Sequence, residues 1–164
     1  MSGLNFQNEK ARPAQRRRAF SFVELTAVVA ILGVVALISV GRFASGTLQN
    51  CAAEGYARQI AVDMLQARRR TISTGDNHYL SLTESGGAVT SYVMWRRASG
   101  GDAIVDATKT TPFGVTVTAS SSTLEFDFDG ASLAAYMVTV AGPNRTWTIT
   151  TTIATGAVAT TVSP

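Results

Sequence analysis

The stretch that decides the fold lies at residues 16–40, which read RRRAFSFVELTAVVAILGVVALISV. From Phe20 to Val40 there are 21 residues with a single charge, Glu24. At about 1.5 Å per residue, a helix of this length spans roughly 31 Å, which matches the thickness of a bilayer core. The segment therefore predicts a helix that crosses a membrane.

The positive charge of the chain is concentrated before this helix. Residues 1–19 carry five basic residues and one acidic residue, a net charge of +4, whereas the remaining nine basic and ten acidic residues give −1. Positive charge before the span places the N-terminus in the cytoplasm and the bulk of the chain outside it. Because the rest of the chain is not basic, a general nucleic-acid-binding surface is not expected.

Four kinds of N-terminal segment combine a basic start with an apolar run. A cleaved secretory signal has a shorter apolar region, of about 7–15 residues. A twin-arginine signal, suggested by Arg17 and Arg18, is usually less apolar. A plain membrane anchor leaves Glu24 without a partner, which costs about 2.5–3.5 kcal/mol on insertion scales. The fourth kind supplies that partner.

The residues around Glu24 resemble the class III signal of the type IV pilin family. The resemblance rests on the leader arginines Arg17 and Arg18, the small residue Ala19, then Phe20, and Glu24 four positions later. In that family a membrane-embedded prepilin peptidase cuts before the phenylalanine and N-methylates the new terminus. The resemblance implies cleavage between Ala19 and Phe20, where the family mostly has glycine before the cut. Glu24 becomes the fifth mature residue, where the family carries its glutamate.

The resemblance also implies how the segment acts after cleavage. Glu24 of one subunit would pair with the Phe20 amine of a neighbour in a helical filament. Two charges that are each costly in an apolar core then become a pair, which sets the register between subunits. The residues expected to assemble the filament are Phe20, Phe22, Glu24 and Leu25.

Residues 41–74 predict an amphipathic continuation of the helix. Tyr56, Ile60 and Met64 recur at helical spacing, and Gly75 is a stop signal. The apolar stripe is widened by Ala57, Ala61, Leu65 and Ile72. The charged residues expected off this stripe are Glu54, Arg58, Asp63 and Arg69. Arg68, Arg69 and Arg70 are expected to complement the dipole at the helix end, and Cys51 to pack inertly.

After Gly75 the spacing changes to the alternation of strands, with frequent Val and Thr. About six or seven short strands joined by turns predict an antiparallel sheet or sandwich, because the intervals are too short for crossover helices. The expected strand faces are His78, Leu80 and Leu82; Val89, Ser91, Val93 and Trp95; Leu124, Phe126 and Phe128; and Trp147, Ile149, Thr151 and Ile153.

This order of elements resembles the GspH/FimT-type minor pseudopilins. The expected fold class is α+β, with a long N-terminal helix packed on a C-terminal antiparallel β-sheet domain. The resemblance extends to Phe126–Gly130 and to a final hairpin near Gly156. The expected parts are a cleaved basic leader (1–19), a transmembrane and filament-core helix (20–40), an amphipathic continuation (41–74) and a periplasmic β-domain (75–164).

No catalytic or cofactor motif is found in the sequence. One cysteine and one histidine exclude an intrachain disulfide framework and a Cys/His zinc cluster. Asp127 and Asp129 before Gly130 resemble a fragment of a calcium loop, but no glutamate follows at the required spacing. They are weak metal candidates, and no metal or cofactor is expected. His78 is expected to be an ordinary strand residue. A further candidate, for partner contact or for local packing, comprises Trp95, Arg96 and Arg97.

The resemblance implies a structural function without enzymatic activity: a minor pseudopilin of a type II secretion system. It would lie in the bacterial inner membrane and then in a pseudopilus. The implied partners are the prepilin peptidase, other pilin subunits and the inner membrane, with no nucleic acid for the β-domain. A type IV pilus minor pilin or DNA-uptake filament subunit stays open. So does a membrane-anchored or secreted β-domain that acts as a binding module.

Overall fold

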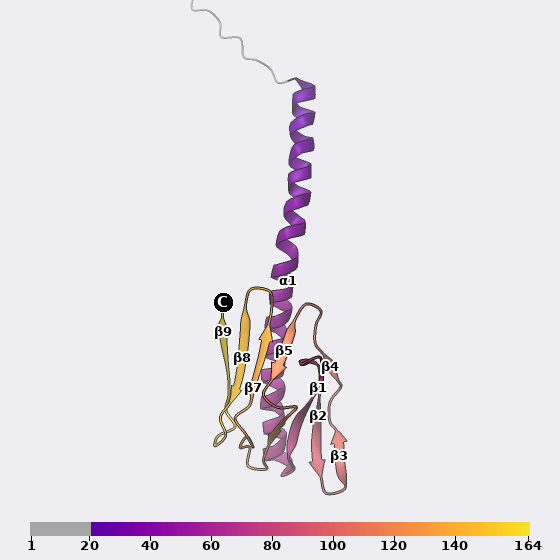
Figure 1. The fold of residues 1–164 in the computed structure, drawn as a ribbon. Helices are drawn as coiled ribbons and strands as arrows, with labels where there is room; N and C mark the ends of the chain where they lie inside the picture. Colours follow the sequence, from indigo (N-terminus) through magenta and orange to yellow (C-terminus); the bar gives the residue numbers. More distant parts are fainter. Residues whose placement is uncertain (1–20) are drawn as a thin grey trace, which may run out of the picture. The chain divides into compact units, whose positions relative to one another are not determined.

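The computed structural model describes residues 21–164, without the side chains of residues 40–45. The chain divides into two units, Met1–Ser39 and Val40–Pro164, and each is described by itself. Helix α1 (Phe22–Thr74) begins in the first unit and ends in the second (Figure 1). It stops where predicted, because Gly75 has a φ of 75° and its N–H donates to the Thr71 carbonyl at 2.9 Å.

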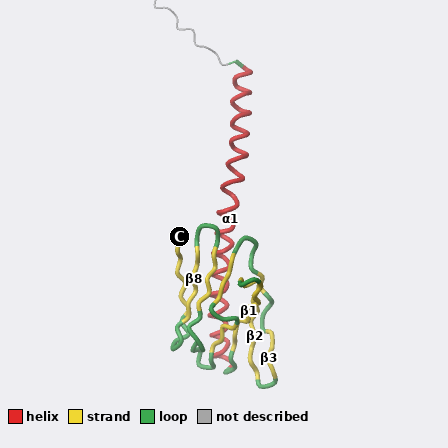
Figure 2. Tube along the Cα trace, viewed as in Figure 1, coloured by secondary structure: helices red, strands yellow, loops and turns green. Residues whose placement is uncertain are grey.

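The rest of the described chain forms two antiparallel sheets, as the alternation predicted (Figure 2). One sheet has the order β3-β2-β1-β6, with β4 also paired to β2, and the other has the order β5-β7-β8-β9. The strands of the first sheet are β1 (His78–Ser85), β2 (Ala88–Ala98), β3 (Gly101–Ile104), β4 (Lys109–Thr110) and β6 (Thr123–Phe126). Those of the second are β5 (Thr116–Ala119), β7 (Met137–Ala141), β8 (Thr146–Thr151) and β9 (Val158–Ser163). The α+β fold class is confirmed.

The core of the second unit lies between α1 and both sheets. Tyr56, Ile60 and Met64 are buried, as their spacing predicted, and they join one cluster with residues of β1, β2 and β5–β8. Ile72 is half-exposed, so its predicted place on the stripe is wrong. It lies twelve residues after Ile60, which places it about 120° around the helix from the buried face. Ala61 and Leu65 are partly buried at the edge of the stripe.

The face of β2 that enters the core differs from the prediction after Val89. Tyr92 and Met94 are buried, whereas the predicted Val93 and Trp95 are only partly buried. The reason is a β-bulge: Thr83 of β1 pairs with Ser91 and Glu84 pairs with Val89, so Thr90 has no partner in the register. One extra residue moves every later side chain to the other face.

Two predicted strands end earlier than expected. β6 ends at Phe126, and Phe128 is exposed in the turn that follows. β8 ends at Thr151, and Ile153 is exposed where the chain turns toward β9. In that turn the Gly156 N–H donates to the Thr152 carbonyl at 2.8 Å, so the backbone has left the strand conformation before the alternation in the sequence stops.

Candidate functional site

The first unit presents a continuous apolar surface. Phe22–Ser39 is long and apolar enough to cross a membrane, and none of it is buried inside the structure. Its hydroxyl groups bond to the helix backbone: Thr26 Oγ1 donates to the Val23 carbonyl at 2.9 Å, and Ser39 Oγ donates to the Val35 carbonyl at 2.8 Å. Since these polar groups are satisfied internally, the segment suits an apolar environment such as lipid or neighbouring helices.

Glu24 is the one ionisable group between residues 21 and 39. It lies in the first turn of α1, where the helix dipole favours negative charge, and its side chain is exposed. Phe22 and Leu25, which lie near Glu24 in the sequence, are also exposed. No residue among 21–164 bonds to the Glu24 carboxylate, so a cation would have to come from elsewhere. The predicted processing residues Arg17, Arg18, Ala19 and Phe20 lie outside the described residues.

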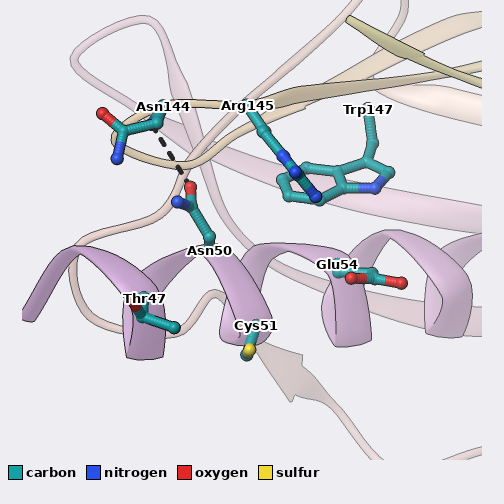
Figure 3. Close-up of a pocket in the computed structure, with 7 residues that line it drawn as sticks. All are labelled: Thr47, Asn50, Cys51, Glu54, Asn144, Arg145 and Trp147. Atoms are coloured by element: carbon teal, nitrogen blue, oxygen red, sulfur yellow. Dashed lines mark hydrogen bonds between the residues drawn. The ribbon is translucent and has the colours of Figure 1, made fainter. Parts of the chain in front are cut away.

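A hollow of about 340 Å³ opens between α1 and the β7–β8 loop (Figure 3). The Asn144 N–H donates to Asn50 Oδ1 at 3.2 Å, which ties the loop to the helix. Cys51 is exposed at its rim, so its predicted packing is wrong: it faces away from the buried stripe that begins at Ala53. The lining contains no histidine that could activate the thiol. The residues that line the hollow are Thr47, Asn50, Cys51, Glu54, Asn144, Arg145 and Trp147.

Of the two alternatives for the candidate at Trp95, local packing describes Trp95 and Arg97, because both contact neighbouring residues of the first sheet. The Trp95 ring stacks on Tyr79, with centroids 6.5 Å apart and planes 7° apart. Arg97 donates to both carboxylate oxygens of Glu125, at 2.9 and 3.0 Å, and lies 5.0 Å from the Tyr79 ring centroid. Burial and the hydrogen bond to Asp102 raise the pKa of Tyr79 to about 12. The network links β1, β2, β3 and β6 on one face of the first sheet.

The alternation predicted that the weak metal candidates lie on a strand face, but the structure places them in a turn. Asp127 and Asp129 follow the end of β6, in a turn that Gly130 closes with a φ of 81°. Asp127 Oδ1 accepts from the Phe128 N–H at 2.7 Å, so this carboxylate stabilises the turn. Within residues 21–164 no group of three or more His, Cys, Asp or Glu side chains could hold a metal ion.

Asp63 was expected off the buried stripe of the helix, and this prediction is wrong because its carboxylate is buried. Its Oδ2 accepts from the Tyr92 hydroxyl at 2.6 Å and from Lys109 Nζ at 2.7 Å. Burial and these bonds raise the pKa of Tyr92 well above its ordinary value. Burial alone would lower the pKa of Lys109, but Asp63 outweighs it and raises that pKa. The spacing of Asp63, three residues after Ile60, was a signal that it lies on the buried face.

Three solved structures resemble the chain. The minor pseudopilin EpsH from the type 2 secretion system of Vibrio cholerae aligns with a TM-score of 0.57 and 11% identity, over 66% of this chain and 95% of that chain. The chain has a pilin-like fold. Two crystal forms of the type IV minor pilin FimU of Pseudomonas aeruginosa align with TM-scores of 0.52 and 0.53 and 14% identity. They cover 68% and 74% of this chain and 92% of FimU.

The pilin-like fold, with its apolar N-terminal helix, confirms the α+β fold expected from the order of elements. No protein-family model and no curated protein sequence matches the chain. Since a minor pseudopilin and a type IV minor pilin both align, the pilin-like fold alone does not distinguish the two filament systems.

Proposed function

We propose that the chain is a structural minor pseudopilin of a type II secretion system, processed by a prepilin peptidase and assembled into a periplasmic pseudopilus. The observation that carries the proposal is Glu24. It is the one ionisable group in the otherwise apolar, exposed segment Phe22–Ser39 of a chain with a pilin-like fold. A carboxylate in such a segment needs a cation, and cleavage before Phe20 would create one at the new terminus.

The proposed processing has two steps. Arg17 and Arg18 hold the leader in the cytoplasm, and the peptidase cuts between Ala19 and Phe20. N-methylation leaves the Phe20 amine able to carry a positive charge, so it can pair with Glu24 of a neighbouring subunit. Phe22 and Leu25, both exposed, then pack against neighbouring helices with the rest of the apolar surface.

The proposed parts act in different compartments. Residues 20–40 serve as the inner-membrane anchor and later as the filament core, while residues 41–74 and the β-domain (75–164) lie in the periplasm. The function requires no catalytic group, and the partners are the peptidase, the membrane and other pilin-like subunits. EpsH is described as a subunit of a type 2 secretion system, which supports this assignment.

The N-terminal residue of the protein in membranes tests the processing step. In cells that contain the matching prepilin peptidase, mass spectrometry should find a chain that begins with N-methylated Phe20 and lacks residues 1–19. In cells without the peptidase the same chain should keep the leader. A chain with Met1 in both strains would indicate a plain anchor, and a cut beyond Val40 would indicate a secreted β-domain.

The Glu24→Ala variant tests assembly separately from processing. The peptidase should cut this variant normally. Its yield of crosslinks to other filament subunits should fall by at least about tenfold, because the neighbour's amine is left unpaired. Thr26→Ala is the matched control: it removes a nearby polar group that bonds only within its own helix. Normal assembly of Glu24→Ala would refute the charge-pair mechanism.

The FimU alignment gives a specific reason to test a second system, the type IV pilus. Deletion of the gene should leave type II substrates in the periplasm while surface pili remain. The opposite result, normal secretion with loss of pili or of DNA uptake, would assign the chain to a type IV filament. If secretion and pili are both intact, the anchored binding module is the better description.

A further inference from the structure

A second hollow, of about 490 Å³, lies at the C-terminal end of α1. One side is polar and comes from His78 and the two cationic residues Arg70 and Arg96. The other side is apolar and comes from β3 and the residue after it. It lies within the second unit. The inference drawn from it does not rest on the proposed filament function. The residues that line it are Arg70, Thr74, His78, Arg96, Ala103, Ile104 and Val105.

The register of three strands brings the polar groups together. His78 of β1 pairs with Arg96 of β2, and Arg96 pairs with Ala103 of β3. Directly opposite residues in antiparallel strands place their side chains on the same face, about 5 Å apart. The next pair on this face, Leu80 with Met94, is buried in the core, so the charged row continues the core face beyond the end of the apolar cluster.

The His78 ring is fixed in one orientation. Only 2% of the residue is exposed, and its backbone N–H donates to Thr71 Oγ1 at 3.1 Å. Nδ1 lies 2.9 Å from the Asp76 carbonyl oxygen, which can only accept, so Nδ1 carries the proton. That assignment leaves Nε2 as the ring nitrogen that can bond to a molecule in the hollow.

Within the described part of the chain, neither arginine is closely paired with a carboxylate, although Asp106 lies near enough to Arg70 to interact with it electrostatically. Arg70 Nη1 contacts the Met94 sulfur at 3.8 Å, a weak acceptor, and within residues 21–164 Arg70 forms no ion pair. Arg96 Nε lies 3.8 Å from Asp76 Oδ2, a long and solvent-exposed ion pair. Burial lowers the pKa of His78, and Arg70 and Arg96 lower it further, whereas the carbonyl and carboxylate of Asp76 act in the opposite direction.

We propose that this hollow binds an organic anion, with its carboxylate or phosphate group between Arg70 and Arg96 and its apolar body on Ala103, Ile104 and Val105. Guanidinium groups recognise both kinds of anionic group through charge-assisted hydrogen bonds. The apolar wall selects a ligand with a carbon body over a free inorganic ion. When His78 is protonated, Nε2–H donates a further hydrogen bond to the anion.

The site is therefore linked to pH. A bound anion stabilises the imidazolium form of His78 and so raises the pKa of the ring. By reciprocity, protonation of the ring tightens binding, by about tenfold for each unit of pKa that the anion adds. An anion that keeps its charge over this range, such as a carboxylate, should bind more tightly at about pH 5.5 than at about pH 8.

Because His78 is the only histidine in the chain, its NMR signal can be assigned without mutagenesis. The experiment uses the full chain, labelled at histidine, in micelles of an uncharged detergent. Phenylphosphate and benzoate are titrated at the two pH values, with inorganic phosphate for comparison. Both organic anions should shift the signal to saturation, at least about tenfold more tightly than inorganic phosphate. Benzoate, which stays ionised at both pH values, should bind more tightly at the lower pH. Absence of a saturable shift would overturn the proposal.

Matched variants test which residues hold the anion. Arg70→Gln and Arg96→Gln should each weaken phenylphosphate binding by at least about tenfold. Arg69→Gln removes the same charge one residue away, from an exposed side chain outside the lining, and should weaken it by less than about twofold. Equal weakening by all three variants would show diffuse attraction and overturn the site.

The apolar wall is tested at an exposed position. Ile104 is 62% exposed, so Ile104→Ser should leave the fold intact. It should reduce the preference for phenylphosphate over inorganic phosphate. An unchanged preference would refute the role of the wall. Circular dichroism of each variant, matched to that of the parent chain, separates a lost site from a lost fold.

Discussion

Among single residues, Asp63 joins three elements of the second unit through one carboxylate. It accepts from Tyr92 of β2 and Lys109 of β4, and Lys109 also pairs with Asp106 at 3.3 Å. Asp63→Ala leaves a partly buried ammonium without its main partner and a buried hydroxyl without an acceptor. It should lower the free energy of unfolding by about 3 kcal/mol.

Asp106→Ala is the control for that measurement, because Asp106 pairs with the same lysine from a more exposed position. It should cost less than about 1 kcal/mol. Thermal unfolding of the full chain in detergent, followed by near-ultraviolet circular dichroism, compares the two. Equal losses would contradict the larger contribution expected of the buried Asp63 carboxylate.

Protonation of a second single residue, His78, makes the stability of the folded chain depend on pH. Its pKa in the folded chain lies below the ordinary value of 6.5, mainly because of burial. Below that ordinary value the unfolded chain therefore binds more protons than the folded chain, so stability falls as the pH falls. Stability that is present at about pH 7.5 should be partly lost by about pH 5, measured as the unfolding midpoint without organic anions.

His78→Gln separates this effect from the titration of carboxylates. The difference in midpoint between parent and variant should shrink as the pH falls, because only the parent has an imidazole to protonate. A difference that is the same at every pH would show that His78 contributes by packing alone.

At the scale of elements, the β8–β9 hairpin depends on one glycine. Gly156 has a φ of 59°, and a Cβ there would overlap the carbonyl oxygen of Gly130 and crowd the Arg68 side chain. Arg68 Nε of α1 donates to that same Gly130 carbonyl at 2.9 Å, so the group that a Cβ at Gly156 would overlap is itself held in place. Gly156→Ala should therefore destabilise the second unit by about 2 kcal/mol and speed hydrogen exchange in β9.

Gly100→Ala provides the comparison for this turn. Gly100 does not have a positive φ, and an added Cβ would meet no atom within 4 Å. Its effect should stay within about 0.5 kcal/mol. If both substitutions have the same effect, the crowding at Gly156 is not what limits the turn.

The elements also show what sequence patterns can and cannot predict. Alternation placed β1, β2 and β8 correctly, since local spacing determines where a strand forms. It failed for the inward face of β2, because the bulge at Thr90 depends on pairing with Thr83 of another strand. The helical pattern also failed for Asp63, which was expected off the buried stripe, because its partner Lys109 is distant in sequence.

At the scale of the whole molecule, the composition around Glu24 predicted the apolar helix, and the change of spacing at Gly75 predicted the α+β order. These features are local in the sequence. The cationic hollow at His78 could not be predicted, because it requires the register of β1, β2 and β3 and the end of α1 to meet. Arg70 and Arg96 are separate basic residues in the sequence, and only the fold makes them one site.

The two units should also separate experimentally. Every residue of the buried core cluster lies between Ala53 and Ile149, and no described residue of 21–39 is buried. The apolar segment therefore adds no core contacts, and a chain that starts at Val40 should fold in water without detergent. Its unfolding midpoint should lie within about 3 °C of the full chain in an uncharged detergent, and near-ultraviolet circular dichroism should show the same aromatic packing. A spectrum without aromatic signals would mean that the second unit needs the apolar segment in order to fold.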